Sequence, residues 1–280
     1  TLLEGITGRL PEGMGMEYTS GALLKHPREI PQTWATGMAQ SADVTIVCAG
    51  LSSFLEGEEG ESLLSPQNGD RESISLPASQ VNYIKELAAS GAKIVLVLTG
   101  GSPIALGEVE DMVDSIVFVW YPGIEGGRAV ADVLFGEIAP AGNLPLTFPK
   151  SLEQLPPFDD YNMTGRTYRY MTKEPLYPFG FGLSYTTFEY CGLEVASPAV
   201  SPSGFDVEVS VKNTGGVAAD EVVQFYISAL ESRLPAPISR LIGFQRIHLE
   251  PGQATTVNLA VTPEMLMLYD ENGCQVFEPG

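Results

Sequence analysis

Three apolar runs decide the fold of the first half of the chain: Ala42-Asp-Val-Thr-Ile-Val-Cys-Ala49, Lys93-Ile-Val-Leu-Val-Leu98 and Ser115-Ile-Val-Phe-Val-Trp120. Each is apolar on both faces, which is typical of a strand buried in a parallel sheet. Amphipathic helices are predicted from Leu76 to about Ala89 and over Glu125–Phe135. This alternation of strands and helices predicts a three-layer α/β/α sandwich with a mainly parallel sheet.

The first 40 residues carry weaker signals. A short strand is predicted over Gly13–Thr19 and a short helix over Thr33–Ser41. After residue 145 the pattern changes, because residues 146–190 are rich in Pro, Tyr, Phe and Gly and have no helical period. We interpret this stretch as an ordered linker that wraps the sheet domain.

The last third of the chain has the pattern of an all-β domain. In Phe205-Asp-Val-Glu-Val-Ser-Val211, apolar and polar residues alternate strictly, and further strands are predicted over Glu221–Ile227 and Ala254–Val261. Short strands at this spacing predict an immunoglobulin-like β-sandwich. We therefore expect an α/β sandwich domain over residues 1–150, a linker over 151–187 and a β-sandwich over 188–280.

Composition excludes several classes of function. The 280 residues carry a net charge of −20, which argues against nucleic acids and anionic membranes as partners and fits a neutral substrate. No apolar segment approaches the roughly 18 residues that a membrane span needs. His26 and His248 are far apart, so we expect no histidine-based catalytic triad, and no Cys/His spacing indicates zinc. We expect no metal and no cofactor.

The three cysteines give little information. Cys48 lies in an apolar run and is expected in the core. Cys191 and Cys274 could form a disulfide, but nothing in the sequence requires one.

The first apolar run leads into an acidic loop. Glu56, Glu58, Glu59 and Glu61 follow within six positions, and Gly69-Asp70-Arg71 closes the loop. Carboxylates at the carboxyl end of a parallel strand lie where α/β proteins usually place their chemistry. On spacing alone, a solvated acidic surface is the favoured interpretation of such a block of charge. A calcium site is disfavoured, because the Asp/Asn/Gly alternation of known calcium loops is absent.

Two other strand ends carry candidate residues. Thr99-Gly-Gly-Ser102 could bind phosphate, but it lacks a full Gly-x-Gly-x-x-Gly and the P-loop lysine, so a tight turn is favoured. Trp120 and Tyr121 could form a platform for a sugar, although packing is the preferred interpretation.

The ordered motifs resemble the C-terminal half of a glycoside hydrolase family 3 enzyme of the β-xylosidase or β-glucosidase type. The resemblance runs from end to end, on Gly50-Leu-Ser-Ser-Phe-Leu-Glu-Gly-Glu-Glu59, Gly69-Asp-Arg71, Val119-Trp-Tyr-Pro-Gly123, Leu155-Pro-Pro-Phe158, Gly165-Arg-Thr-Tyr-Arg-Tyr170, Tyr177-Pro-Phe-Gly-Phe-Gly-Leu-Ser-Tyr185, Val211-Lys-Asn-Thr-Gly215 and Glu250-Pro-Gly252. It implies an α/β sandwich domain followed by a fibronectin type III-like domain.

The resemblance also implies what the chain works with. In such enzymes a (β/α)8 barrel supplies the nucleophilic aspartate, and no stretch here matches it, so we expect a fragment, a nicked chain or a subunit whose barrel is elsewhere. The expected partners are that barrel and an oligosaccharide or aryl glycoside, with no nucleic acid and no membrane; a homodimer is compatible with the resemblance. The expected location is secreted or periplasmic, with the signal upstream of residue 1.

The resemblance implies that Glu58 is the general acid/base. Glu59 and Glu56 are rivals, because the insert Ser62–Asn68 leaves open which glutamate aligns with that of the family motif. Asp70 and Arg71 are expected to form an ion pair that anchors the loop. The implied activity is that of an exo-acting retaining β-glycosidase that releases terminal β-D-xylose or β-D-glucose. The alternative is a non-catalytic carbohydrate-binding or scaffolding fragment.

The linker carries three further candidates, Arg166, Tyr168 and Tyr170. They are expected to bind the linker to its neighbours, although one of them could approach the mouth of an active site.

Overall fold

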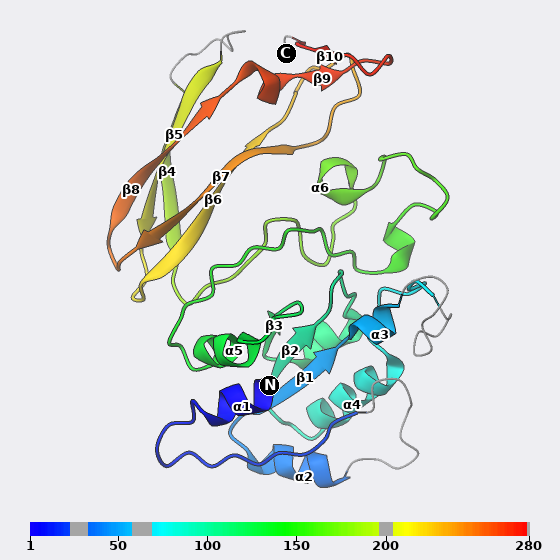
Figure 1. Cartoon of the computed structure of the whole chain (residues 1–280), viewed down its shortest axis with the longest axis vertical. Coiled ribbons are helices and arrows are strands. Elements are labelled where there is room, and N and C mark those ends of the chain that lie inside the picture. Colours follow the sequence, from blue (N-terminus) through cyan, green and yellow to red (C-terminus); the bar gives the residue numbers. More distant parts are fainter. Residues whose placement is uncertain (23–32, 58–68, 196–203, 279–280) are drawn as a thin grey trace. The chain divides into compact units, whose positions relative to one another are not determined.

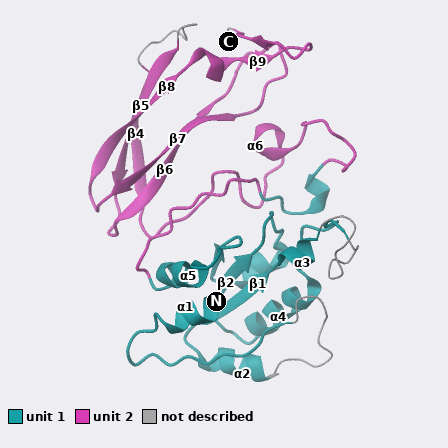
Figure 2. Cartoon of the chain, viewed as in Figure 1, with its two compact units in different colours: residues 1–135, 148–155 teal, residues 136–147, 156–280 magenta. Residues whose placement is uncertain are grey.

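The computed structural model describes residues 1–22, 33–57, 69–195 and 204–278, and the chain divides into two compact units (Figure 2). Unit 1 comprises residues 1–135 and 148–155, and unit 2 comprises residues 136–147 and 156–280. The division into three regions at residues 150 and 187 stays a prediction.

Unit 1 is built on a parallel sheet in the order β1-β2-β3, with strands Thr45–Gly50, Ile94–Thr99 and Ser115–Phe118 (Figure 1). Its helices and 3-10 turns are α1 (Leu2–Thr7), α2 (Thr33–Ser41), α3 (Ser53–Glu56), α4 (Ala78–Ala89), η1 (Gly107–Met112), α5 (Gly126–Leu134) and η2 (Leu152–Gln154). Helix α4 links β1 to β2, as a crossover between parallel strands requires. The predicted α/β architecture is confirmed.

The core of unit 1 lies against the central strand. Ile94, Leu96 and Leu98 of β2 are at most 1% exposed, as are Ile84 and Leu87 of α4. Burying each such side chain contributes about 1.5–3 kcal/mol. Because all three strands run the same way, their carboxyl ends meet at one edge of the sheet, and the acidic loop begins at that edge. Within the described residues, no helix is long and apolar enough to cross a membrane.

The structure corrects three local predictions in unit 1. Residues 13–19 form no strand. The third strand ends at Phe118 because Trp120 has a φ of +54°, a left-handed conformation that a strand cannot contain. Cys48 is exposed and not in the core, whereas Val47, on the opposite face of β1, is buried; the thiols of all three cysteines are free.

Helices α1 and α5 approach each other unusually closely. A Cβ on Gly127 would lie 2.0 Å from the Thr1 carbonyl oxygen, and a Cβ on Gly5 would lie 1.9 Å from the Gly127 carbonyl oxygen. Two glycines therefore let the backbones touch. Beside this contact, Arg9 Nε lies 2.6 Å from an oxygen of Asp132 on α5.

Unit 2 holds the antiparallel sheets. Its strands are β4 (Phe188–Val195), β5 (Phe205–Asn213), β6 (Ala219–Ile227), β7 (Arg240–Leu249), β8 (Ala254–Val261), β9 (Leu268–Tyr269) and β10 (Gln275–Val276), with α6 (Thr167–Tyr170) and η3 (Pro263–Leu266) beside them. The sheet β4-β5-β8 and the pair β6-β7 enclose a core of Val209, Val211, Val223, Phe225, Leu249 and Val257. The predicted β-sandwich is confirmed.

Candidate functional site

The acidic loop begins at a rigid strand end. Gly50 closes β1 with a φ of +121°, and a Cβ there would lie 2.1 Å from the Thr99 carbonyl oxygen, so the position needs glycine. The buried Gln80 side chain accepts a hydrogen bond from the Gly50 amide and donates one to the Gly50 carbonyl, each at 2.7 Å. The chain is therefore fixed in position shortly before it reaches Glu56.

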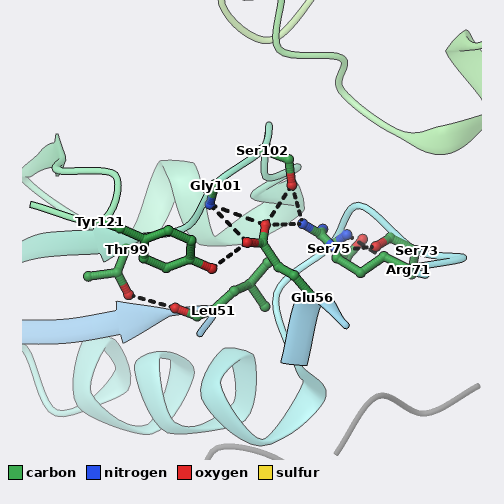
Figure 3. A network of polar contacts seen from close by, with 9 residues as sticks. All are labelled: Leu51, Glu56, Arg71, Ser73, Ser75, Thr99, Gly101, Ser102 and Tyr121. Atoms are coloured by element: carbon green, nitrogen blue, oxygen red, sulfur yellow. Dashed lines mark hydrogen bonds and ion pairs between the residues drawn. The ribbon is translucent and has the colours of Figure 1, made fainter. Parts of the chain in front are cut away.

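The Glu56 carboxylate lies in a cradle of hydrogen-bond donors (Figure 3). The Gly101 amide nitrogen is 3.2 and 3.1 Å from its two oxygens, and the Ser102 hydroxyl donates to Oε1 at 2.7 Å. The Tyr121 hydroxyl donates to Oε2. Gly101 and Ser102 follow β2, and Tyr121 follows β3. A residue just beyond β1 is thus bound by the turns after both other strands of the sheet.

Arg71 reaches the same carboxylate from the other end of the loop. Its Nη1 lies 3.4 Å from Glu56 Oε1 and 2.9 Å from Ser102 Oγ, while Nε donates to the Ser73 carbonyl at 2.9 Å. The side chains of Glu56 and Arg71 are only 17% and 13% exposed, so water screens their attraction less than that of a surface pair. The pair joins the two ends of the segment from residue 57 to residue 70.

The surroundings of Glu56 keep it ionised. Burial alone would raise its pKa, but hydrogen bonds from Tyr121, Ser102 and Gly101, together with the charge of Arg71, outweigh burial and lower the pKa below its ordinary value. Burial and the hydrogen bond to Glu56 raise the pKa of Tyr121. Burial lowers the pKa of Arg71, and Glu56 opposes that effect. These partners stabilise the ionised form of the carboxylate.

The ion pair expected between Asp70 and Arg71 does not form in the described part of the chain. The Asp70 side chain is exposed, whereas Arg71 turns inward and pairs with Glu56. Adjacent side chains need not face the same side of the backbone, and here they do not. The anchoring carboxylate is Glu56, which the sequence placed among the rivals for the acid/base.

The other predicted acidic residues cannot be placed in the same way. Glu58, Glu59 and the insert Ser62–Asn68 lie outside the described residues. Their roles remain predictions.

The turns after β2 and β3 have a role that the sequence did not reveal. The Gly101–Ser102 turn binds an anion, but the anion is a carboxylate of the same chain. Trp120 packs edge-on against Phe118 and Phe148, with ring centroids 4.6 and 6.3 Å away, as the packing interpretation predicted. The position of Tyr121 at the carboxyl end of a strand beside β1 is the one signal that could have indicated its contact with Glu56.

The three linker candidates lie within unit 2. Arg166 donates to the carbonyls of Pro157 and Asp160 at 2.9 and 2.6 Å and thereby organises the chain between them. The Tyr168 ring stacks on Phe179 at 4.3 Å, and its hydroxyl accepts from the Leu241 amide at 3.1 Å. Tyr170 is half-buried at the end of α6.

Comparison with known proteins identifies the class of the chain. Residues 1–185 match the glycosyl hydrolase family 3 C-terminal domain, and residues 221–280 match the fibronectin type III-like domain. The chain therefore belongs to glycoside hydrolase family 3.

The relatives of the chain include both xylosidases and glucosidases. The chain is 43% identical to the xylan 1,4-beta-xylosidase of Xylanibacter ruminicola over 84% of its own length and 27% of that protein. It is 33% identical to the periplasmic beta-glucosidase of Salmonella typhimurium, over 100% of the chain and 40% of the relative. A solved β-glucosidase from Erythrobacter marinus superposes with a TM-score of 0.85 at 31% identity, over 100% of the chain and 40% of that structure. The chain thus spans well under half the length of these relatives.

Proposed function

We propose that the chain is the acid/base-bearing part of an exo-acting retaining β-glycosidase that releases terminal β-D-xylose or β-D-glucose. Glu58 acts as the general acid/base, and the nucleophilic aspartate lies on a (β/α)8 barrel outside this chain. The names of the relatives support the reaction class. The substrate is an oligosaccharide or an aryl glycoside, and the location is secreted or periplasmic, in keeping with the relative that is named periplasmic.

The observation that carries the proposal is the anchored base of the acidic loop. Glu56 and Arg71 tie both ends of the loop to the carboxyl edge of the sheet, in contact with the turns after β2 and β3. A loop that serves only to hydrate the surface gains nothing from a largely buried ion pair at its base. A loop that has to deliver a carboxyl group accurately does gain from one.

The chemistry explains why the proton donor should not be Glu56. A retaining glycosidase holds two carboxyl groups about 5–5.5 Å apart, and one of them must be protonated when it meets the glycosidic oxygen. That carboxyl needs a raised pKa, which an apolar wall or neighbouring carboxylates can supply. The pKa of Glu56 is lowered instead. Glu58 is therefore our first choice, and Glu59 remains its rival.

The test is Glu58→Gln in the full-length enzyme, which includes the barrel. We expect kcat/KM to fall steeply for aryl glycosides whose leaving groups need protonation and little for dinitrophenyl glycosides, because the latter leave without a proton. Glu59→Gln is the matched comparison. Wild-type rates for Glu58→Gln on every substrate would refute the assignment. A non-catalytic binding fragment would instead be indicated if the full-length protein bound xylo- or gluco-oligosaccharides without hydrolysing them.

A further inference from the structure

Glu56 differs from an ordinary surface glutamate because its carboxylate is saturated with donors. An ionised carboxylate offers about four acceptor sites. Here the Gly101 amide, the Ser102 and Tyr121 hydroxyls and the Arg71 guanidinium all point at it. No acceptor site is left over for a substrate proton. The function of Glu56 must therefore be exerted through the structure that it holds.

That structure is the base of the glutamate loop. Glu56 precedes the loop, Arg71 follows it, and both are bound to the turn after β2 through Ser102. Joining the ends of a segment reduces the number of conformations that it can adopt. Holding Glu56 therefore fixes the point from which the loop leaves the sheet.

We propose that Glu56 is a positioning residue for the general acid/base, and that it works together with Tyr121, Ser102 and Arg71 as a clamp on the loop. The proposal rests on the proposed function, since it assumes that the loop carries the acid/base. Proton transfer by the acid/base then depends on the Glu56 carboxylate, which does not contact the substrate. Misplacement of a catalytic group by about 1 Å can lower the rate on the order of 100-fold, so a clamp of this kind affects catalysis directly.

Glu56→Gln is the sharpest perturbation of this clamp. The glutamine has nearly the same shape but only one acceptor oxygen, and its NH2 group faces donors. The hydroxyls of Ser102 and Tyr121 can turn to accept, whereas the Gly101 amide and Arg71 cannot. The variant therefore unbalances the cradle without creating a cavity.

The experiment compares Glu56→Gln, Glu56→Asp and Glu58→Gln in the full-length enzyme. For Glu56→Gln we expect kcat/KM on poor leaving groups to fall on the order of 100-fold, with dinitrophenyl glycosides nearly unaffected. Glu56→Asp, which keeps the charge, should recover part of the loss. Tyr121→Phe removes a single donor and should give a smaller loss of the same selectivity, which keeps the test valid if Glu56→Gln folds poorly. Lys85→Gln is the control, because it breaks another ion pair of unit 1, with Glu108 at 2.5 Å.

Azide and the pH profile separate a positioning residue from the acid/base itself. Replacing the acid/base by glutamine removes the titrating carboxyl and with it the basic limb of the pH profile, whereas truncating it to alanine also leaves room for azide to attack the glycosyl-enzyme. We expect loss of the basic limb in Glu58→Gln and azide rescue in Glu58→Ala, and neither sign in Glu56→Gln or Glu56→Ala. If the Glu56 variants showed them, Glu56 would be the acid/base and the clamp would be refuted. Equal losses on all substrates in Glu56→Gln would also refute it, since they indicate general destabilisation. If Glu58→Gln showed no selective loss, the proposed role of Glu58 would fail, whatever Glu56→Gln did.

Discussion

Replacing Gln80 by leucine should detach the end of β1 from helix α4. The Gln80 side chain is 4% exposed and makes two hydrogen bonds of 2.7 Å, one to the amide and one to the carbonyl of the buried Gly50. Leucine fills a similar volume but leaves both backbone groups without a partner. A buried polar group that loses its partner costs about 1–3 kcal/mol, so the two together should lower the free energy of unfolding by about 4 kcal/mol.

The assay is equilibrium urea unfolding of the 280-residue chain, followed by the fluorescence of the two tryptophans, which both lie in unit 1. The matched control is Gln40→Leu, because Gln40 is exposed and makes one long hydrogen bond of 3.4 Å to Ser90. That change should stay within about 0.5 kcal/mol of the wild type. If Gln80→Leu cost less than about 1 kcal/mol, the two hydrogen bonds would not be holding the strand end, and the reasoning on the rigid start of the loop would be wrong.

Two further predictions test the packing and the electrostatics of unit 1. Gly127→Ala should destabilise the chain by about 1–3 kcal/mol in the same urea assay, because its Cβ would lie 2.0 Å from the Thr1 carbonyl oxygen. In Gly37→Ala in α2, the new Cβ meets nothing within 4 Å, and the change should stabilise the chain by about 0.5–1 kcal/mol. A lower free energy of unfolding in Gly37→Ala, or an unchanged one in Gly127→Ala, would contradict the open space at Gly37 or the close contact at Gly127. The pKa of Glu56 is lowered on folding, so its contribution to stability is present above its ordinary pKa of 4.5 and is lost as the pH falls through the folded value. The stability gap between wild type and Glu56→Gln, measured by urea unfolding, should therefore be widest near pH 7 and narrow below pH 4.5, and a gap independent of pH would show that Glu56 is not held as an anion.

The fold was predictable because its signals are local and strong. The strands β2 and β3 are apolar except for Thr99 and Ser115 at their ends, and the alternation in β5 assigns one face to the core, so patterns of a few residues specify both architectures. The prediction for Cys48 was wrong because its burial depends on which elements pack against its strand, and the sequence of the strand does not contain that information. Cys48 is exposed while Val47 beside it is buried, because successive residues of a strand lie on opposite faces.

The site was only partly predictable for the same reason. The sequence placed Glu56 and Arg71 at the two ends of one loop, but their meeting depends on the fold of the residues between and around them. Ser102 and Tyr121 lie 46 and 65 positions away from Glu56 in the chain, and only the parallel sheet brings them to it. Adjacency in sequence suggested Asp70 as the partner of Arg71. The Arg71 side chain instead points inward to Glu56, whereas Asp70 is exposed.

Glutamates of one loop can differ in protonation because the cradle has only enough hydrogen-bond donors to stabilise one carboxylate. A structural anion needs many donors, whereas a proton-donating carboxyl needs few donors and a neighbour that opposes its charge. The Gly101, Ser102 and Tyr121 donors are all taken up by Glu56, and Arg71 balances its charge. Since the clamped pair has no net charge, Glu56 contributes little to raising the pKa of the acid/base. Under the proposed function, the rise that the general acid requires must then come from other carboxylates near it or from an apolar surface.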